Sequence, residues 1–208
     1  MVRIHPPQPV NKGNSKVKIA ITGHTRGIGK ALFDKFQAEG HEVIGFSTST
    51  GYDISKDAAR VVTESRSCDV FINNAFHVTA QTALLIAMLG IWRGADKLII
   101  NVSSKGALYP SANTRLQDEY LTPKIKQGEI IRQAMLNGFP QILNVLPGVV
   151  DTDMANILTA PKKMNPADLA NFLYMVTMMR SQLAIQQLVI DVPGQNWADA
   201  KFDLSKVI

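Results

Sequence analysis

The chain has 208 residues, of which 46% are hydrophobic and 19% charged, with a formal net charge of +5. This length and balance predict one ordinary soluble globular domain with a single large core. One cysteine excludes an internal disulfide, and the four histidines lack the spacing of metal ligands, so we expect no metal site.

Two further classes of partner are disfavoured. No segment approaches the ~18 uninterrupted apolar residues of a membrane span, and the first residues lack the apolar core of a signal peptide. We therefore expect a cytoplasmic protein without a membrane partner. The basic residues are scattered, which argues against a nucleic-acid partner and fits an anionic small molecule.

Residues 1–16 contain several prolines and polar residues and predict a flexible arm, followed by one domain over residues 17–208.

The apolar segments alternate between two kinds along the chain. Residues 17–22 are a short β-branched run, and residues 28–39 follow with helical periodicity. A second run at 42–46 completes a strand–helix–strand unit, which is the unit of parallel sheets. Further strands are expected at 69–73, 97–103, 141–147 and 187–192, with helices near 79–92, 124–137 and 166–181. This alternation predicts an α/β fold: a doubly wound, Rossmann-like parallel sheet with helices on both faces and ligands outside the carboxyl ends of the strands.

A glycine-rich turn directly follows the first strand, with the sequence Thr22-Gly23-His24-Thr25-Arg26-Gly27-Ile28-Gly29. One glycine permits the tight bend, another lets the backbone approach a pyrophosphate, and a third lets the helix pack against the strand. The amino end of the following helix attracts the anion. Because a strand precedes the turn and a helix follows it, a dinucleotide site is favoured over an ordinary loop.

This pattern, TGxxxGIG, resembles the cofactor fingerprint of the short-chain dehydrogenase/reductase family, and other motifs of that family follow in order. Asp53-Ile54 is similar to the pair that contacts adenine, and residues 73–75 resemble the NNAG motif. Ser104 follows a strand as the family's catalytic serine does, and Tyr120 with Lys124 matches YxxxK. Residues 147–152 match PGxVxT, which holds the nicotinamide carboxamide in the family. The resemblance spans residues 17 to about 192.

The resemblance implies a set of site residues and a reaction. The catalytic residues would be Ser104, Tyr120 and Lys124. The cofactor-binding residues would be Gly23, Thr25, Arg26, Gly27, Ile28, Gly29, Ser47, Thr48, Asp53, Ile54, Asn74, Ala75, Lys124, Pro147, Gly148, Val150 and Thr152. The reaction would be hydride transfer between a nicotinamide cofactor and a carbonyl/alcohol pair, and relatives commonly form homodimers or homotetramers.

The end of the second strand bears on which nicotinamide cofactor binds. An acidic residue there would bind a ribose 2′-hydroxyl and repel a 2′-phosphate, but the sequence is Phe46-Ser47-Thr48-Ser49. Arg26 matches a basic position of NADP-preferring relatives, and the hydroxyls can donate to a phosphate. NADP(H) is therefore favoured. The alternative is that Arg26 is a solvated surface charge and that NAD(H) binds as well.

The chemistry explains why the family uses a tyrosine with a lysine. A phenol with a pKa near 10 is too weak an acid to protonate an alkoxide unless a nearby cation favours its anion. By resemblance, Tyr120 would exchange the proton, Lys124 would lower the pKa of Tyr120 and hold the nicotinamide ribose, and Ser104 would hydrogen-bond the substrate oxygen.

Several features depart from the family pattern. Pro123 predicts that the helix begins only near this residue, which would leave Tyr120 off the helix. Ser111 is a second candidate for the catalytic serine. Phe76 replaces the glycine of NNAG and adds a ring beside the nicotinamide pocket unless it turns into the core. Gln81 is a candidate for the missing helix asparagine, and His77 either touches the substrate or is structural.

The chain is also shorter than typical members of the family. Little sequence separates Phe46 from Asp53, so the helix after the second strand is expected to be missing and the third strand shortened. The loop between Thr152 and Pro166 predicts a small substrate lid. The alternative function is a redox-inactive NADP-binding sensor or interaction protein on the same fold, and the sequence does not identify a substrate.

Overall fold

The structure of the protein is a computed structural model that describes residues 16–109, 117–137, 140–160, 162–194 and 201–202. The predicted N-terminal arm lies almost entirely outside these residues, as does the second serine candidate, Ser111. Within them, no helix is both long enough and apolar enough to cross a membrane.

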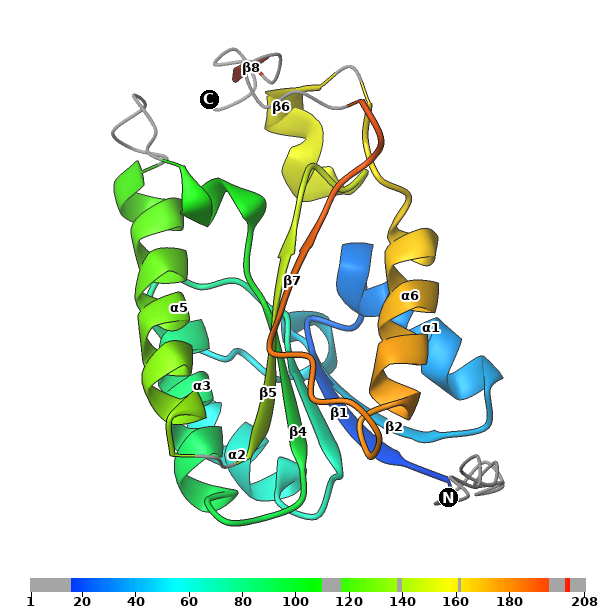
Figure 1. Cartoon of the computed structure of the whole chain (residues 1–208), viewed down its shortest axis with the longest axis vertical. Helices are drawn as coiled ribbons and strands as arrows, with labels where there is room; N and C mark the ends of the chain where they lie inside the picture. Colours follow the sequence, from blue (N-terminus) through cyan, green and yellow to red (C-terminus); the bar gives the residue numbers. More distant parts are fainter. Residues whose placement is uncertain (1–15, 110–116, 138–139, 161, 195–200, 203–208) are drawn as a thin grey trace, which may run out of the picture.

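A six-stranded sheet forms the centre of the molecule, with the strand order β2-β1-β3-β4-β5-β7 (Figure 1). Every pair of neighbouring strands is parallel. The strands are β1 (Lys18–Thr22), β2 (Glu42–Phe46), β3 (Val70–Asn73), β4 (Leu98–Val102), β5 (Gln141–Pro147) and β7 (Gln187–Ile190). The chain starts at β1, turns outward to β2 and then crosses back to β3, which confirms the predicted doubly wound sheet.

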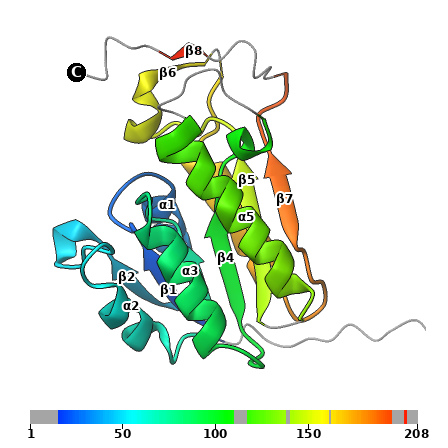
Figure 2. The ribbon, with the colours of Figure 1, turned by 90° about the vertical axis from the view of Figure 1, so that its left-hand side faces the viewer.

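Helices cover both faces of this sheet (Figures 1 and 2). One face carries α1 (Gly27–Ala38) and α6 (Pro166–Met178), which contact each other. The other face carries α2 (Ala58–Ser65), α3 (Ala80–Ile91) and α5 (Thr122–Met135). This layered arrangement confirms the predicted helices at four places and adds α2, which was not predicted.

Two apolar clusters follow from the alternation of side chains along each strand. On β1, Ile19 and Ile21 point into the cluster under α1 and α6, whereas Ala20 points into the cluster under α2 and α3. All three residues are fully buried, as expected for a parallel strand covered on both faces. The strands are thereby packed between two apolar clusters, and the carboxyl edge of the sheet borders this core.

Short elements follow the strands at this carboxyl edge, and those next to β6 and β8 lie at the top of Figure 1. They are the 3₁₀ turns η1 (Thr48–Thr50), η2 (Lys105–Leu108) and η4 (Asp153–Ile157), and the π-helical turn η3 (Gln117–Leu121). A two-residue antiparallel pair joins β6 (Leu158–Thr159) to β8 (Lys201–Phe202). A loop, η4 and β6 thus occupy the position of the predicted small lid.

The segment between Phe46 and Asp53 differs in part from the expectation. As expected, no α-helix lies between Phe46 and Asp53, and α2 begins only after Asp53. The expected shortened strand is absent as well: the segment contains only η1, and β2 is an edge strand of the sheet. The segment is too short for a crossover, which takes roughly a dozen residues or more. The helix that follows, α2, escaped prediction because it is short and largely polar, with only Val61 and Ser65 buried.

Candidate active site

The glycine turn after β1 has the backbone geometry that its sequence predicts. Gly23 and Gly27 have φ angles of 73° and 55°, a region that favours glycine. A methyl group on Gly29 would overlap the backbone of Gly23 and stand 2.6 Å from the Asn74 amide. The turn is therefore closed too tightly for a side chain at Gly29, and it opens directly into α1.

Asn74 and Ala75 brace this turn from the end of β3. The Thr22 hydroxyl accepts hydrogen bonds from the backbone N–H groups of Asn74 and Ala75, both at 3.0 Å. The Asn74 side chain in turn donates to the Thr22 carbonyl at 3.0 Å. On the far side, the Thr152 side chain lies against Gly27. The predicted cofactor residues from three strand ends thus meet around one turn.

A group of hydroxyls lies where the cofactor's 2′ position is expected. Thr25 Oγ1 lies 2.8 Å from Ser47 Oγ, and Ser49 Oγ lies 3.2 Å from Thr25 Oγ1. Arg26 is exposed at the start of α1, and the described residues give it no ion-pair partner. Thr48 is exposed on η1. This end of β2 presents hydroxyls and a cation, with no carboxylate between Ser47 and Gly51.

Asp53 and Ile54 follow η1 but have different surroundings. The Asp53 carboxylate accepts from the backbone and hydroxyl of Ser55, at 2.9 and 2.7 Å. The hydrogen bonds from Ser55 and the nearby Lys56 hold the pKa of Asp53 below its ordinary value. Ile54 is buried in the cluster under α2 and α3. The carboxylate is therefore engaged in a local turn.

Tyr120 and Lys124 come together at the start of α5, but from two different elements. Tyr120 lies on η3, whereas α5 begins at Thr122, with Pro123 in its first turn. The prediction that the α-helix starts only near Pro123 is confirmed. The π-helical turn continues directly into α5, so the Lys124 ammonium still lies 5.7 Å from the centre of the Tyr120 ring.

The Lys124 ammonium is buried, and no carboxylate of the described residues pairs with it. Its side chain is 3% exposed, and Nζ donates to Gln81 Oε1 at 2.8 Å and to the Val102 carbonyl at 2.7 Å. Burial lowers the pKa of Lys124 to about 7, from an ordinary value of 10.5. Two neutral acceptors thus fix the position of the ammonium but do not compensate fully for lost hydration.

Ser104 completes the cluster from the end of β4. Its hydroxyl accepts from the Gly106 N–H at 3.2 Å and caps η2. Burial of the Tyr120 hydroxyl raises the pKa of Tyr120, and a hydrogen bond from Ser104 offsets part of this effect. All three predicted catalytic residues therefore meet, and the surroundings favour the neutral forms of both Tyr120 and Lys124.

Gln81, in the first turn of α3, contacts Lys124 directly. Its Nε2 donates to the carbonyls of Asn73 and Val102, at 2.9 and 3.1 Å. Both donors of the amide are thereby used, and Oε1 is left to face Lys124. Gln81, the candidate for the missing helix asparagine, thus lies beside Lys124.

A buried row of amides, which was not predicted from the sequence, supports this contact. Asn73, Asn101 and Asn144 stand in register on neighbouring strands. Asn73 donates to Asn101 at 3.0 Å, and Asn101 donates to Asn144 and to Gln127 on α5, both at 3.1 Å. The available signal was an asparagine within each of three largely apolar strands, which a buried hydrogen-bonded network would explain.

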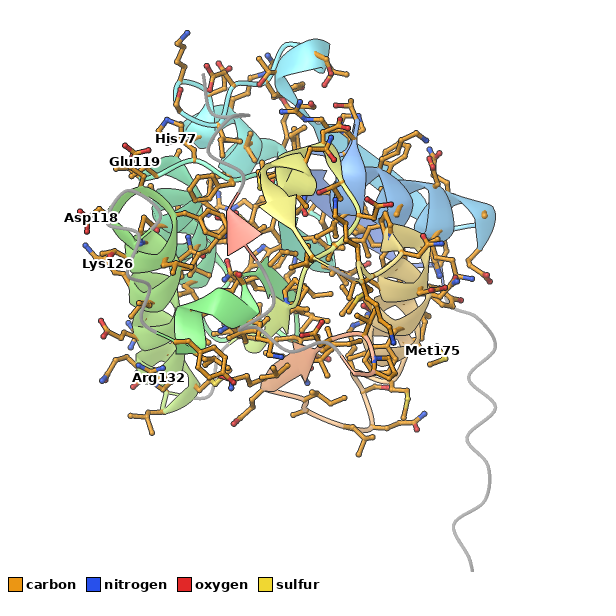
Figure 3. All side chains as sticks on the ribbon, turned by 90° about the horizontal axis from the view of Figure 1, so that it is seen from above. His77, Asp118, Glu119, Lys126, Arg132 and Met175 are labelled. Atoms are coloured by element: carbon orange, nitrogen blue, oxygen red, sulfur yellow. The ribbon has the colours of Figure 1, made fainter. Side chains whose placement is uncertain are left out.

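Phe76 and His77 follow the Asn73–Ala75 segment. The Phe76 ring packs edge-to-face on Tyr120, with centroids 4.9 Å apart, so it lies beside a candidate catalytic residue. His77 Nδ1 accepts from the backbone N–H groups of Thr79 and Ala80, at 3.3 and 3.2 Å, and so caps α3. Viewed from the carboxyl edge, His77 lies on the same side of the molecule as Glu119 (Figure 3). The structural role of His77 is thereby supported.

Pro147, the last residue of β5, and Gly148 lie at the carboxyl end of that strand. A side chain on Gly148 would overlap the carboxylate of Asp191, which pairs with Lys105 at 2.7 Å. Pro147 and Val150 are buried. The ion pair joins the turn after Ser104 to the end of β7, and both of its side chains are less than one-fifth exposed.

Comparison with known proteins supports the fold. No protein-family model matches the chain, and no curated protein matches it. Solved structures do. A short-chain dehydrogenase from Burkholderia cenocepacia J2315, in complex with NADP, is 16% identical with a TM-score of 0.68, over 85% of this chain and 89% of that one. The 3-alpha-hydroxysteroid dehydrogenase from Pseudomonas sp. B-0831, in complex with NADH, is 19% identical with a TM-score of 0.66, over 84% and 95%.

A blue fluorescent protein from a metagenomic library, in complex with NADPH, is 18% identical with a TM-score of 0.64, over 86% of this chain and 97% of that one. The fold of this chain is therefore that of the short-chain dehydrogenase structures.

Proposed function

We propose that this protein is a short-chain dehydrogenase/reductase that binds NADP(H) and interconverts a carbonyl and an alcohol. The observation that carries this proposal is the meeting of Ser104, Tyr120 and Lys124 at the carboxyl edge, on the same sheet as the glycine turn. Ligands of doubly wound sheets bind at this edge, where the strand order reverses. Here the reversal falls between β1 and β3.

The residues present fit a dinucleotide. The tight turn at Gly29 brings the backbone of Gly23 and the start of α1 to one place, which suits a pyrophosphate. NADP(H) is favoured over NAD(H) because Arg26 and the hydroxyls of Thr25 and Ser47 offer a cation and donors to a 2′-phosphate. Solved structures of this fold carry either cofactor, so the preference rests on these side chains.

The catalytic residues would act on the substrate oxygen. When bound, NADPH supplies the hydride. In carbonyl reduction, Tyr120 donates its phenolic proton to the oxygen, and Ser104 hydrogen-bonds the same oxygen. Lys124 in its ammonium form stabilises the phenolate that remains, and Gln81 and the Val102 carbonyl hold the ammonium in place.

Exposed apolar side chains around this edge favour a hydrophobic substrate. Leu108 and Tyr109 after β4, and Met154 after β5, are each about half exposed. These residues follow strands that end at the proposed site, so they would flank a bound carbonyl compound. A homodimer or homotetramer, which the family resemblance implies, is also part of the proposal.

A redox-inactive NADP-binding protein is the second candidate. Two observations favour it. The Phe76 ring packs on Tyr120, which limits contact between Tyr120 and a substrate. The lowered pKa of Lys124 reduces the positive charge that could stabilise a Tyr120 phenolate. This candidate predicts cofactor binding without turnover.

The test is NADPH oxidation by the purified protein over a panel of small and hydrophobic aldehydes and ketones. Turnover of at least one compound, lost in Tyr120→Phe, supports the reductase. Turnover that persists in Tyr120→Phe would contradict the proposed role of Tyr120. Tight NADPH binding without turnover across the panel would favour the redox-inactive candidate. Light scattering at micromolar concentration tests the oligomer, and a monomer would contradict that part.

A further inference from the structure

Phe76 occupies a distinctive position over the catalytic pair. Its ring centroid lies 5.3 Å from the Lys124 ammonium and 4.9 Å from the Tyr120 ring. The side chain is partly exposed, whereas Lys124 beneath it is 3% exposed. The ring therefore stands between the ammonium and solvent on one side of the cluster.

The backbone that carries this ring is firmly held. Asn74 and Ala75 are hydrogen-bonded to Thr22 on β1, and His77 caps α3 immediately afterwards. Phe76 is thus anchored on both sides by contacts that do not involve its own side chain. Replacing the ring leaves these anchors in place, so its effect on Lys124 can be measured separately from its effect on folding.

We propose that the Phe76 ring is the cover of the Tyr120–Lys124 pair, which keeps water from the Lys124 ammonium and thereby sets the fraction of molecules that carry a charge there. The consequence for catalysis rests on the proposed reductase function, because only the charged lysine stabilises the Tyr120 phenolate. The effect on Lys124 itself does not depend on that function.

Two opposing effects of the ring must be weighed. An aromatic face attracts a cation within about 6 Å, which would favour charged Lys124. Exclusion of water favours the neutral form. Burial is the cause that lowers the pKa of Lys124 to about 7, and no charge contributes to it. Loss of hydration can shift the pKa of a fully buried lysine by up to about 3–5 units, whereas a cation–π contact contributes about 0.5–2 kcal/mol, or roughly one pKa unit, so removal of the ring should favour the charged form.

The polar groups around Lys124 do not account for its lowered pKa. From α3 it faces the neutral amide of Gln81, and from β4 the carbonyl of Val102. From η3 it faces the Tyr120 ring, whose centre is 5.7 Å from the ammonium, and no carboxylate of the described residues pairs with it. The Phe76 ring is the apolar group whose removal would admit water to the ammonium.

The test is an NMR titration of protein labelled with [ε-¹³C]lysine, in which the Lys124 signal is assigned by its loss in Lys124→Met. We expect a midpoint at about pH 7 in the wild type. Phe76→Ala should move the midpoint up by about one pH unit, because water reaches the ammonium. Phe76→Leu keeps an apolar cover without an aromatic face, and its midpoint should stay at or slightly below the wild-type value.

Phe172→Ala is the matched control, since Phe172 is also a partly buried phenylalanine but lies on α6, with the cluster on the other face of the sheet. Its Lys124 midpoint should equal that of the wild type. An unchanged or lowered midpoint in Phe76→Ala would overturn the proposal, and a lowered one would identify the ring as a cation–π partner. Because the readout is a titration, a midpoint that moves as expected supports the cover even if the protein turns over no carbonyl.

Discussion

The two halves of the candidate site lie on one sheet edge but are built in different ways. Around the glycine turn, backbone groups and exposed hydroxyls face solvent, with Arg26 beside them. Around Lys124, the polar atoms are buried and bonded to amides and carbonyls. The first half suits a hydrated anion that binds and leaves. The half around Lys124 suits proton transfer, because electrostatic interactions are stronger where water is excluded.

The largest expected effect falls in the buried half. Tyr120→Phe removes the proposed proton donor and should lower kcat for carbonyl reduction by about 10²- to 10⁴-fold, the usual range for a general acid. NADPH affinity should change little. Steady-state kinetics and cofactor titration measure the two quantities, with Tyr174→Phe on α6 as the control. Equal kcat in Tyr120→Phe and wild type would remove Tyr120 from the mechanism.

The glycine turn should tolerate no side chain at its tightest point. Gly29→Ala places a methyl group against the Gly23 backbone and should cost about 1–3 kcal/mol of stability and abolish measurable NADPH binding. Urea unfolding and calorimetry measure these effects. Gly90→Ala is the matched control, because the space beside Gly90 on α3 is open and alanine favours a helix. Tight NADPH binding by Gly29→Ala would show that the turn is not the cofactor cradle.

The buried lysine should make stability depend on pH. Between about pH 7 and 10.5, Lys124 is protonated in the unfolded chain but neutral in the folded protein. The unfolded state then binds more protons, so stability should rise with pH across this window, by up to about 1.4 kcal/mol per pH unit. Below pH 7 both states are charged and this contribution is constant.

Urea unfolding of the wild type and Lys124→Met at pH 7 and pH 9 isolates the effect. The stability difference between the two proteins should shift in favour of the wild type at the higher pH. A difference that does not change between these values would mean that the lysine is charged in the folded protein.

The smallest expected effect concerns the solvent-exposed half of the site around the glycine turn. Arg26→Ala should weaken NADPH binding by about tenfold, which corresponds to the loss of one charge-assisted hydrogen bond, and leave NADH binding unchanged. The loss should shrink at high salt, since exposed charges are screened. Equal losses for both cofactors would place Arg26 outside the 2′-phosphate site.

Much of the fold could be predicted from the sequence because its signals are local. The apolar runs at β1, β3, β4 and β5 and the glycines after β1 depend on neighbouring residues only. The element that escaped was α2, which has little apolar surface to bury. The expected shortened strand before Asp53 was wrong, since the chain there is too short to cross the sheet.

The candidate site was less predictable where it depends on contacts between distant residues. Ser104, Tyr120 and Lys124 could be named from their motifs, and the structure brings them together. The amides of Asn101 and Gln127 could not be connected, because their bonds join separate strands and helices. Pro123 correctly indicated where α5 begins, but the π-helical turn that still carries Tyr120 has no local signature.

The central claim is that the carboxyl edge of this sheet binds a nicotinamide dinucleotide, with a preference for NADPH. Isothermal titration calorimetry of the purified protein with NADPH and NADH tests it most directly. We predict saturable binding of one NADPH per chain, tighter than that of NADH. Absence of binding by either cofactor would contradict the interpretation of the glycine turn and, with it, the proposed function.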